Sequence, residues 1–136
     1  MSSGYWYREI ERLETELIEL KKYKQNMNNL KNIVNYLVDG LYEMGHKLIS
    51  IGDKFIGAYK DSNRPLDLSI NVVSTGNSDI SKSRELEVLG KNIETELTKI
   101  DIDIEEKNKA LSNAKFSYMQ AKKLEANPEV TPWVLQ

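Results

Sequence analysis

The sequence contains no cysteine, one histidine and only three prolines among its 136 residues. The absence of cysteine excludes a disulfide framework, a thiolate nucleophile and cysteine-ligated zinc or iron–sulfur sites. Neither a catalytic triad nor a histidine metal cluster can be assembled around His46 without partners. No stretch approaches the roughly 18 apolar residues of a membrane-spanning helix, and no basic segment followed by an apolar core marks a secretory signal. We therefore expect no membrane span, and a protein that stays in the cytoplasm or is exported without a cleavable signal peptide.

The charge balance and the short motifs also indicate no catalytic, nucleotide-binding or metal-binding site. Lysine and arginine total 19 against 21 acidic residues, so the net charge is only -2 and no nucleic-acid footprint stands out. The stretch from Gly40 to Lys47 lacks the serine or threonine of a phosphate-binding loop. The alternating acids from Asp101 to Glu105 lack the glycine of a calcium loop. The sequence thus predicts no enzyme, with no catalytic or metal-binding residues, no cofactor, no small-molecule substrate and no nucleic-acid partner.

What the sequence does contain is helical periodicity. The first arm, about residues 5–60, begins with apolar residues three and four apart, slips at Tyr23, and resumes from Met27 to Phe55. It carries Gly40, Gly45, Gly52 and Gly57, each costing about 1 kcal/mol relative to alanine inside a helix. Either the arm breaks near Gly40, or it continues and the glycines let another backbone approach closely. The unbroken spacing through Leu41 favours continuity.

An insert over residues 61–83 interrupts the helical pattern. Asn63-Arg64-Pro65 should end the first arm, and Leu66, Leu68, Ile70 and Val72 alternate with polar residues as in a strand. Gly76-Asn77-Ser78-Asp79 is typical of a turn. The insert can be a mobile loop, an extended segment packed on the hairpin, or a strand that pairs with a partner. Alternation favours an ordered segment over a mobile loop.

A second helical arm follows over about residues 84–126, with apolar residues three and four apart from Leu86 to Ala121 and a missed position at Lys107. Residues 127–136 form an apolar tail, which either packs on the helices or serves as a docking peptide. Two amphipathic arms joined by a long connection predict an all-α fold, a long antiparallel helical hairpin resembling a coiled coil. We expect residues 1–136 to form this single domain.

Two helices alone make a thin core, so we expect a helical protein partner, a homo-oligomer, or both. Tyr5, Trp6 and Tyr7 form the densest aromatic group, which is either an anchor in the core or an exposed binding patch. The candidate partner-binding residues are apolar and lie in the aromatic group, the second half of the first arm, the insert and the tail. They are Tyr5, Trp6, Tyr7, Leu41, Met44, Leu48, Ile51, Phe55, Leu66, Leu68, Ile70, Val72 and Trp133.

A small, cysteine-free helical hairpin resembles the Esx (WXG-type) proteins and the small helical proteins that accompany LXG toxins in type VII secretion of Gram-positive bacteria. The likeness covers the two arms, residues 5–59 and 83–125, and is one of architecture. The sequence departs from the family pattern in two motifs. Neither Trp6 nor Trp133 is followed two residues later by the glycine of a Trp-x-Gly motif, and Lys122 replaces the acid expected four residues after Tyr118. The connection between the arms is also longer than the usual tight turn. The resemblance implies an adaptor that pairs with another helical protein, such as a toxin's N-terminal region, for export.

A second hypothesis is a structural coiled-coil protein, such as a phage or cell-envelope assembly component, that self-oligomerises. An enzyme or metal protein ranks last. Co-purification with a helical toxin would favour the adaptor, and a defined oligomer without a partner would favour the structural protein.

Overall fold

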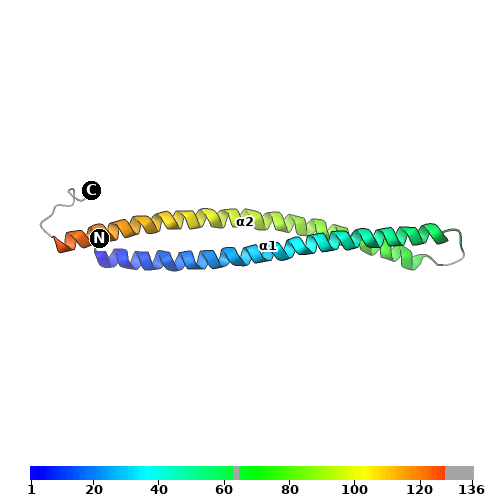
Figure 1. Ribbon diagram of the computed structural model, residues 1–136, viewed down its shortest axis with the longest axis horizontal. Coiled ribbons are helices and arrows are strands. Elements are labelled where there is room, and N and C mark those ends of the chain that lie inside the picture. Colours follow the sequence, from blue (N-terminus) through cyan, green and yellow to red (C-terminus); the bar gives the residue numbers. More distant parts are fainter. Residues whose placement is uncertain (63–64, 128–136) are drawn as a thin grey trace. The chain divides into compact units, whose positions relative to one another are not determined.

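The computed structural model describes residues 1–62 and 65–127 as two helices joined by a short connection (Figure 1). Helix α1 spans Ser3–Tyr59 and helix α2 spans Asp67–Ala126, and no strand occurs in this part of the chain. The two helices pack against each other, which confirms the predicted all-α hairpin. Helix α1 runs without a break through Gly40 and Gly45, so the continuous form of the first arm is confirmed.

The predicted strand in the insert is wrong, because residues from Asp67 onward belong to α2. Pro65 precedes the helix. The Asp67 carboxylate lies in the first turn, where its negative charge interacts favourably with the positive end of the helix dipole. Leu68, Ile70 and Val72 therefore lie in a helix, and Leu66 lies just before it. The small residues Ser69 and Gly76 take the buried positions of this helical segment. The predicted turn at Gly76 is also helical.

Local capping explains where the described helix ends lie. The Ser2 side-chain oxygen accepts a hydrogen bond of 3.3 Å from the backbone N–H of Tyr5, as at an N-cap. At the other end of α1, the Ser62 N–H and hydroxyl both donate to the carbonyl of Tyr59, at 3.0 and 2.8 Å. These bonds satisfy backbone groups that a helix end leaves without an intrahelical partner.

The chain divides into two compact units, each of which contains a segment of both helices. The terminal unit consists of Met1–Asn26 and Leu97–Gln136, and the turn unit consists of Met27–Glu96. Within the terminal unit the segments are antiparallel, because Ser3 contacts Glu125 while Lys24 contacts Asp101. Within the turn unit they are also antiparallel, because Lys31 contacts Glu94 while Ser83 contacts Val38. That both units form one domain stays a prediction.

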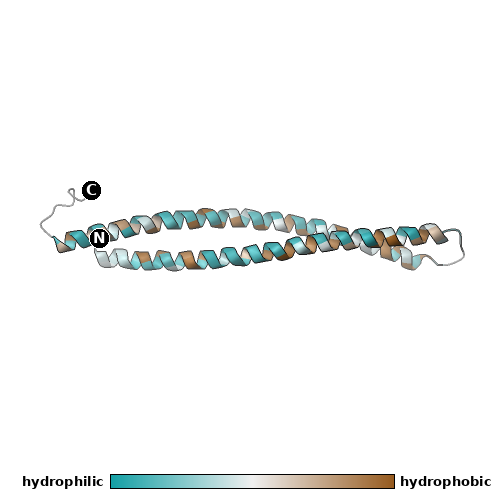
Figure 2. Cartoon of the chain, viewed as in Figure 1, coloured by the Kyte–Doolittle hydropathy of each residue, from teal (hydrophilic) through white to brown (hydrophobic). Residues whose placement is uncertain are grey.

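Each helix buries a row of residues spaced alternately three and four apart, which we call the inner seam. Figure 2 shows apolar residues along both helices, interrupted by polar ones. In α1 the seam consists of Ser3, Trp6, Ile10, Leu13, Leu17, Leu20, Lys24, Met27, Lys31, Val34, Val38, Leu41, Gly45, Leu48 and Gly52, all buried or half-buried. This spacing is the heptad repeat of a coiled coil. The predicted slip at Tyr23 is wrong, because the seam passes through Lys24 and Lys31 without a change of step.

Lysines occupy three inner-seam positions and are each paired with an acid from the other helix. In the terminal unit, Lys24 pairs with Asp101 at 2.6 Å and Lys107 pairs with Glu16. In the turn unit, Lys31 pairs with Glu94 at 3.1 Å. The lysine stems cover apolar surface while their ammonium groups reach the edge of the seam. Lys107, predicted as a missed position, thus belongs to the seam of α2.

Neither helix contains, within the residues that the structure describes, a segment both long and apolar enough to cross a membrane. Of the predicted tail over 127–136, residues 128–136, including Trp133, lie outside the described residues.

Candidate interaction surface of the turn unit

The two helices of the turn unit approach backbone to backbone at two places along their seam. A Cβ atom built on Gly45 would lie 2.7 Å from the carbonyl oxygen of Gly76, and one built on Gly76 would lie 2.6 Å from the carbonyl oxygen of Gly45. A Cβ on Gly52 would lie 3.1 Å from the carbonyl oxygen of Ser69. Only glycine permits such an approach, which is why two helix-weakening residues occur in the middle of α1.

Small residues recur every seven positions along the inner seam of α2. They are Ser69, Gly76, Ser83 and Gly90. Ser83 is fully buried, and its hydroxyl donates a hydrogen bond of 2.8 Å to the backbone carbonyl of Val38 on α1. A buried hydroxyl needs such a partner, and this bond fixes the register of the two helices. Sequence reasoning missed this seam, although the sevenfold spacing of Gly and Ser could have revealed it.

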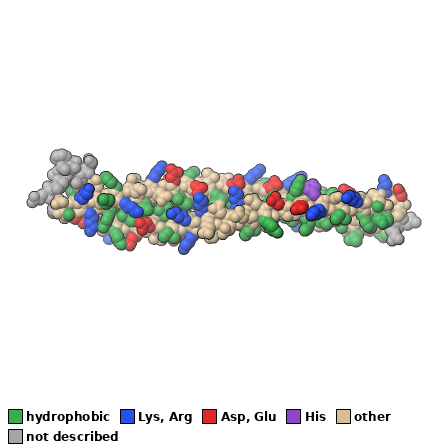
Figure 3. All heavy atoms as spheres, in the orientation of Figure 1, with side chains coloured by type: hydrophobic (Ala, Val, Ile, Leu, Met, Phe, Trp, Pro, Cys, Tyr) green, Lys and Arg blue, Asp and Glu red, His purple; other side chains and the backbone are tan. Residues whose placement is uncertain are grey.

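Between these small residues the seam of the turn unit holds buried apolar side chains such as Val34, Ile80 and Ile93, and many further large apolar side chains lie on the outside of the unit. Figure 3 shows hydrophobic side chains on this face of the molecule among the charged ones. The exposed large hydrophobic residues described in this unit are Leu30, Ile33, Tyr36, Leu37, Tyr42, Met44, Ile51, Phe55, Tyr59, Leu68, Ile70, Val88 and Leu89. Contiguous exposed apolar surface of this kind marks interaction sites in soluble proteins.

Next to the connection, α1 and α2 together form an apolar groove of about 400 Å³. We call this the turn groove, and its lining residues are Ile51, Gly52, Phe55, Pro65, Leu68, Ser69 and Val72. Ser69 supplies the only side-chain hydroxyl among them. Phe55 is 49% exposed and Leu68 is 77% exposed, so both walls of the groove present large apolar side chains to the outside. The groove brings together four of the predicted partner-binding residues, from both sides of the connection.

The other predicted partner-binding residues of this unit lie in different places. Leu41 and Leu48 are half-buried in the inner seam, and Leu66 is half-buried just before α2. Met44 and Ile70 are exposed but do not line the turn groove. Trp133 lies outside the described residues.

The aromatic group of the terminal unit divides between the core and the surface. Trp6 occupies an inner-seam position and is half-buried, whereas Tyr5 and Tyr7 are exposed. Tyr5 meets the Trp6 ring edge-on, with centroids 5.0 Å apart, and the Tyr7 ring lies 6.3 Å from that of Tyr118. A hydrogen bond to the carboxylate of Glu11 raises the pKa of Tyr7. Trp6 thus belongs to the inner seam of this unit, whereas Tyr5 and Tyr7 are on its surface.

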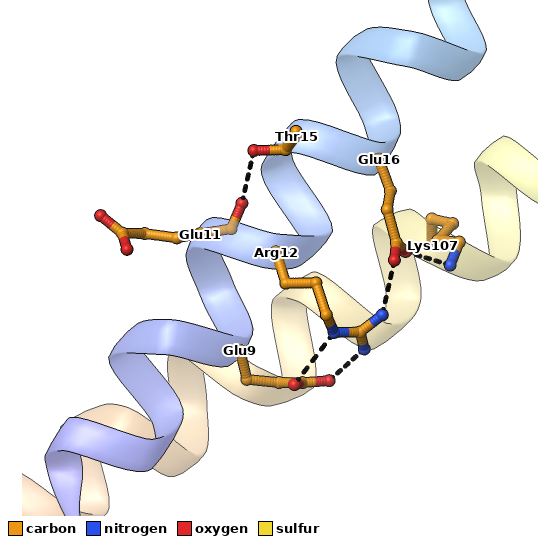
Figure 4. Close-up of polar contacts among 6 residues, drawn as sticks. All are labelled: Glu9, Glu11, Arg12, Thr15, Glu16 and Lys107. Atoms are coloured by element: carbon orange, nitrogen blue, oxygen red, sulfur yellow. Dashed lines mark hydrogen bonds and ion pairs between the residues drawn. The ribbon is translucent and has the colours of Figure 1, made fainter.

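Charged pairs line the flanks of the terminal unit. Arg12 donates to both Glu9 and Glu16, and Glu16 also pairs with Lys107 of α2 (Figure 4). The hydrogen bond from Lys107, followed by those from Arg12, lowers the pKa of Glu16. These pairs place charge beside the seam, where the turn unit has apolar side chains.

A carboxylate of α2 caps the start of α1 in the terminal unit. Glu125 accepts hydrogen bonds from the backbone N–H of Ser3, at 2.9 Å, and from its hydroxyl, at 2.7 Å. These bonds lower the pKa of Glu125, the backbone bond more than the hydroxyl bond. A negative charge at a helix N-terminus also interacts favourably with the helix dipole.

Comparisons with known proteins give no relative for this chain. No protein-family model matches it, and no curated protein and no solved structure matches it either. The resemblance to the Esx proteins therefore stays a prediction.

Proposed function

We propose that the protein is a non-enzymatic interaction protein that binds an amphipathic helix of another protein in the turn groove. The observation that carries this proposal is the groove itself, with apolar walls formed by Phe55 of α1 and by Leu68 and Val72 of α2. Covering an exposed side chain of this size contributes about 1.5–3 kcal/mol. A partner that places two or three apolar residues there gains several kcal/mol toward the cost of association.

The backbone around the groove favours a helix over a strand as the occupant. Apart from Pro65, its lining residues lie inside α1 or α2, and apart from the first-turn N–H groups of Leu68 and Ser69 their backbone groups are in helical positions that bond within the helix. An added strand would need free backbone donors and acceptors along an edge, whereas a helix brings its own hydrogen bonds and needs only apolar contact. Anchors spaced three and four residues apart on the partner fit this surface.

The resemblance to Esx and LXG-associated proteins supplies the biological setting of the proposal. It suggests that the partner is the helical N-terminal region of a toxin, and that the pair is exported together by type VII secretion in a Gram-positive bacterium. A second candidate function is a structural coiled-coil protein that self-assembles. The exposed apolar row on the outside of α1 favours that candidate, because it gives a second copy a surface to bind.

Two matched substitutions test the groove. Phe55→Glu places a charge in the turn groove, while Phe116→Glu places the same charge at another exposed phenylalanine, in the terminal unit. Tagged versions of both and of the wild type are expressed in the native host, and the co-purifying proteins are identified by mass spectrometry. We expect one partner with an amphipathic helix that wild type and Phe116→Glu retain and Phe55→Glu loses. Equal recovery by both variants would contradict the proposal.

A further inference from the structure

A second apolar row runs along α1 of the turn unit, one residue before the seam positions Lys31, Val38, Gly45 and Gly52. We call it the outer row; its members alternate in steps of three and four and are Leu30, Ile33, Leu37, Gly40, Met44, Lys47 and Ile51. Its five large apolar side chains are between 42% and 62% exposed. A helix with two such rows has one more apolar face than a hairpin can bury.

The middle of the outer row is hollow. Gly40 has nothing within 4 Å of the position that a Cβ would take, and a depression of about 350 Å³ lies over it. Leu37, Met44 and Tyr36 are among the residues that line this depression. Glycine in an exposed helix costs about 1 kcal/mol relative to alanine. Close packing against α2 accounts for Gly45, but nothing in the described chain accounts for Gly40.

We infer that the outer row is a two-fold interface, in which α1 of one copy packs antiparallel on α1 of a second copy with Gly40 at the axis. In that register Leu37 faces Met44 of the second copy, and Leu30 faces Ile51 of the second copy. Gly40 then faces Gly40, so that the two backbones can approach as closely as they do at Gly45 and Gly76. Both copies thus contribute the same residues to the contact, as an isologous interface requires.

The charges along the row fit an antiparallel second copy. Lys47 lies opposite Ile33 of the second copy, where its stem packs while its ammonium group pairs with Glu43 of its own helix at 3.4 Å. On the adjacent flank, Tyr36 lies opposite Glu43, so the tyrosine hydroxyl can donate to the carboxylate. A parallel pair would instead set Lys47 against Lys47, and like charges in register oppose association. The charge pattern therefore selects the antiparallel pair.

The size of the row sets the strength of the contact. From Leu30 to Ile51 the row is three heptads, or about 30 Å of helix. One helix-on-helix contact of this length falls short of the roughly 800 Å² per partner that stable complexes bury. We expect a dimer that forms in the micromolar range and dissociates on dilution.

Cysteine cross-linking tests the register, because the chain has no cysteine of its own. A disulfide needs Cα atoms about 4.4–6.8 Å apart, so Gly40→Cys should form a covalent dimer under mild oxidation. Gly57→Cys is the matched control, since Gly57 is also a helical glycine with open space around it but lies outside the row. Leu30→Cys should cross-link to Ile51→Cys in a mixture, and neither should cross-link efficiently with itself. Equal cross-linking at positions 40 and 57, or none at 40 and none in the mixture, would overturn the inference.

Light scattering on the purified chain tests the same surface without a cross-link. Wild type and Gly57→Lys should rise from the monomer mass toward twice that mass as concentration increases, while Gly40→Lys should stay monomeric. A wild type that stays monomeric at millimolar concentration would overturn the inference and assign the row to a helix of another protein. Both experiments use the chain alone, and Gly40 and Gly57 lie outside the turn groove, so the outcome at these two positions is separate from that of the groove. Phe55→Glu should leave the cross-link at position 40 unchanged.

Discussion

In the terminal unit, large side chains such as Leu13 and Leu17 fill the inner seam and ion pairs cover its flanks. In the turn unit, Gly45 and Gly76 bring the two backbones together between buried apolar residues such as Val34 and Ile80, and many further large apolar side chains lie on the outside. Both units are antiparallel helix pairs with the same heptad spacing. The difference shows that a helix pair can close on small residues and keep its large apolar residues available for another molecule.

The difference also divides the tasks of the chain. A seam of leucines stabilises the terminal unit by removing apolar surface from water. A seam in which glycine and serine alternate with apolar residues buries less apolar surface, so the turn unit depends more on the backbone approach, on the Ser83 hydrogen bond and on whatever covers its outside. We therefore expect substitutions in the two units to have different effects.

The largest effect should come from emptying the terminal seam. Leu13 is 2% exposed, and Leu13→Ala should lower the free energy of unfolding by about 2–5 kcal/mol through lost burial and a cavity. Ile18→Ala, at an exposed position of the same helix, should change it by less than about 0.5 kcal/mol. Urea unfolding followed by circular dichroism measures both. A small loss at Leu13 would show that the terminal unit is not held by its apolar seam.

Removal of the Ser83 hydroxyl should have a smaller effect, confined to the turn unit. Ser83→Ala keeps a small side chain at the seam and loses the hydrogen bond to Val38, which should cost about 1 kcal/mol. Hydrogen exchange resolved by peptide should show faster exchange in residues 27–96 than in the wild type. Unchanged exchange there would mean that the hydroxyl does not fix the register.

The smallest effect should come from pH, and it should fall on the terminal unit. The pKa values of Glu16 and Glu125 are lowered in the folded protein by their hydrogen bonds. The stability that they contribute is therefore complete above the ordinary carboxyl pKa, about 4.3, and is lost as the pH falls through the lower folded values. Hydrogen exchange corrected for intrinsic rates should show lost protection near Ser3 at acid pH, and Glu125→Gln should reduce this dependence. Equal loss in both units would contradict this assignment.

The sequence predicted the helices better than it predicted how they meet. The spacing of apolar residues was sufficient to predict a continuous α1 and most of α2, because a regular heptad pattern is a strong local signal. Gly76 was predicted to lie in a turn and Ser69 in a strand, because sequence propensities are local. Their contacts with Gly45 and Gly52 across the hairpin, which favour the helical conformation, are not local.

The candidate surface was predicted only in part. Phe55, Leu68 and Val72 were named from their apolar character, and the structure brings them together because α2 begins at Asp67. Leu41 and Leu48 were named for the same reason, yet they face the inner seam. Hydrophobicity alone cannot tell a seam residue from an outer one when a helix has two apolar rows. The small seam residues, which decide which row is inside, carried no apolar signal.

The most direct test of this account is the sign of the stability change for alanine at four glycines. Gly45→Ala and Gly76→Ala should lower the free energy of unfolding by about 1–3 kcal/mol, because the added Cβ would collide with backbone atoms of the facing helix. Gly57→Ala has open space and Gly90→Ala only an ordinary contact at 3.7 Å, so each should raise it by up to about 1 kcal/mol. Urea unfolding of the four variants gives the answer. A rise at all four positions would contradict the backbone contact on which the exposed apolar surface depends.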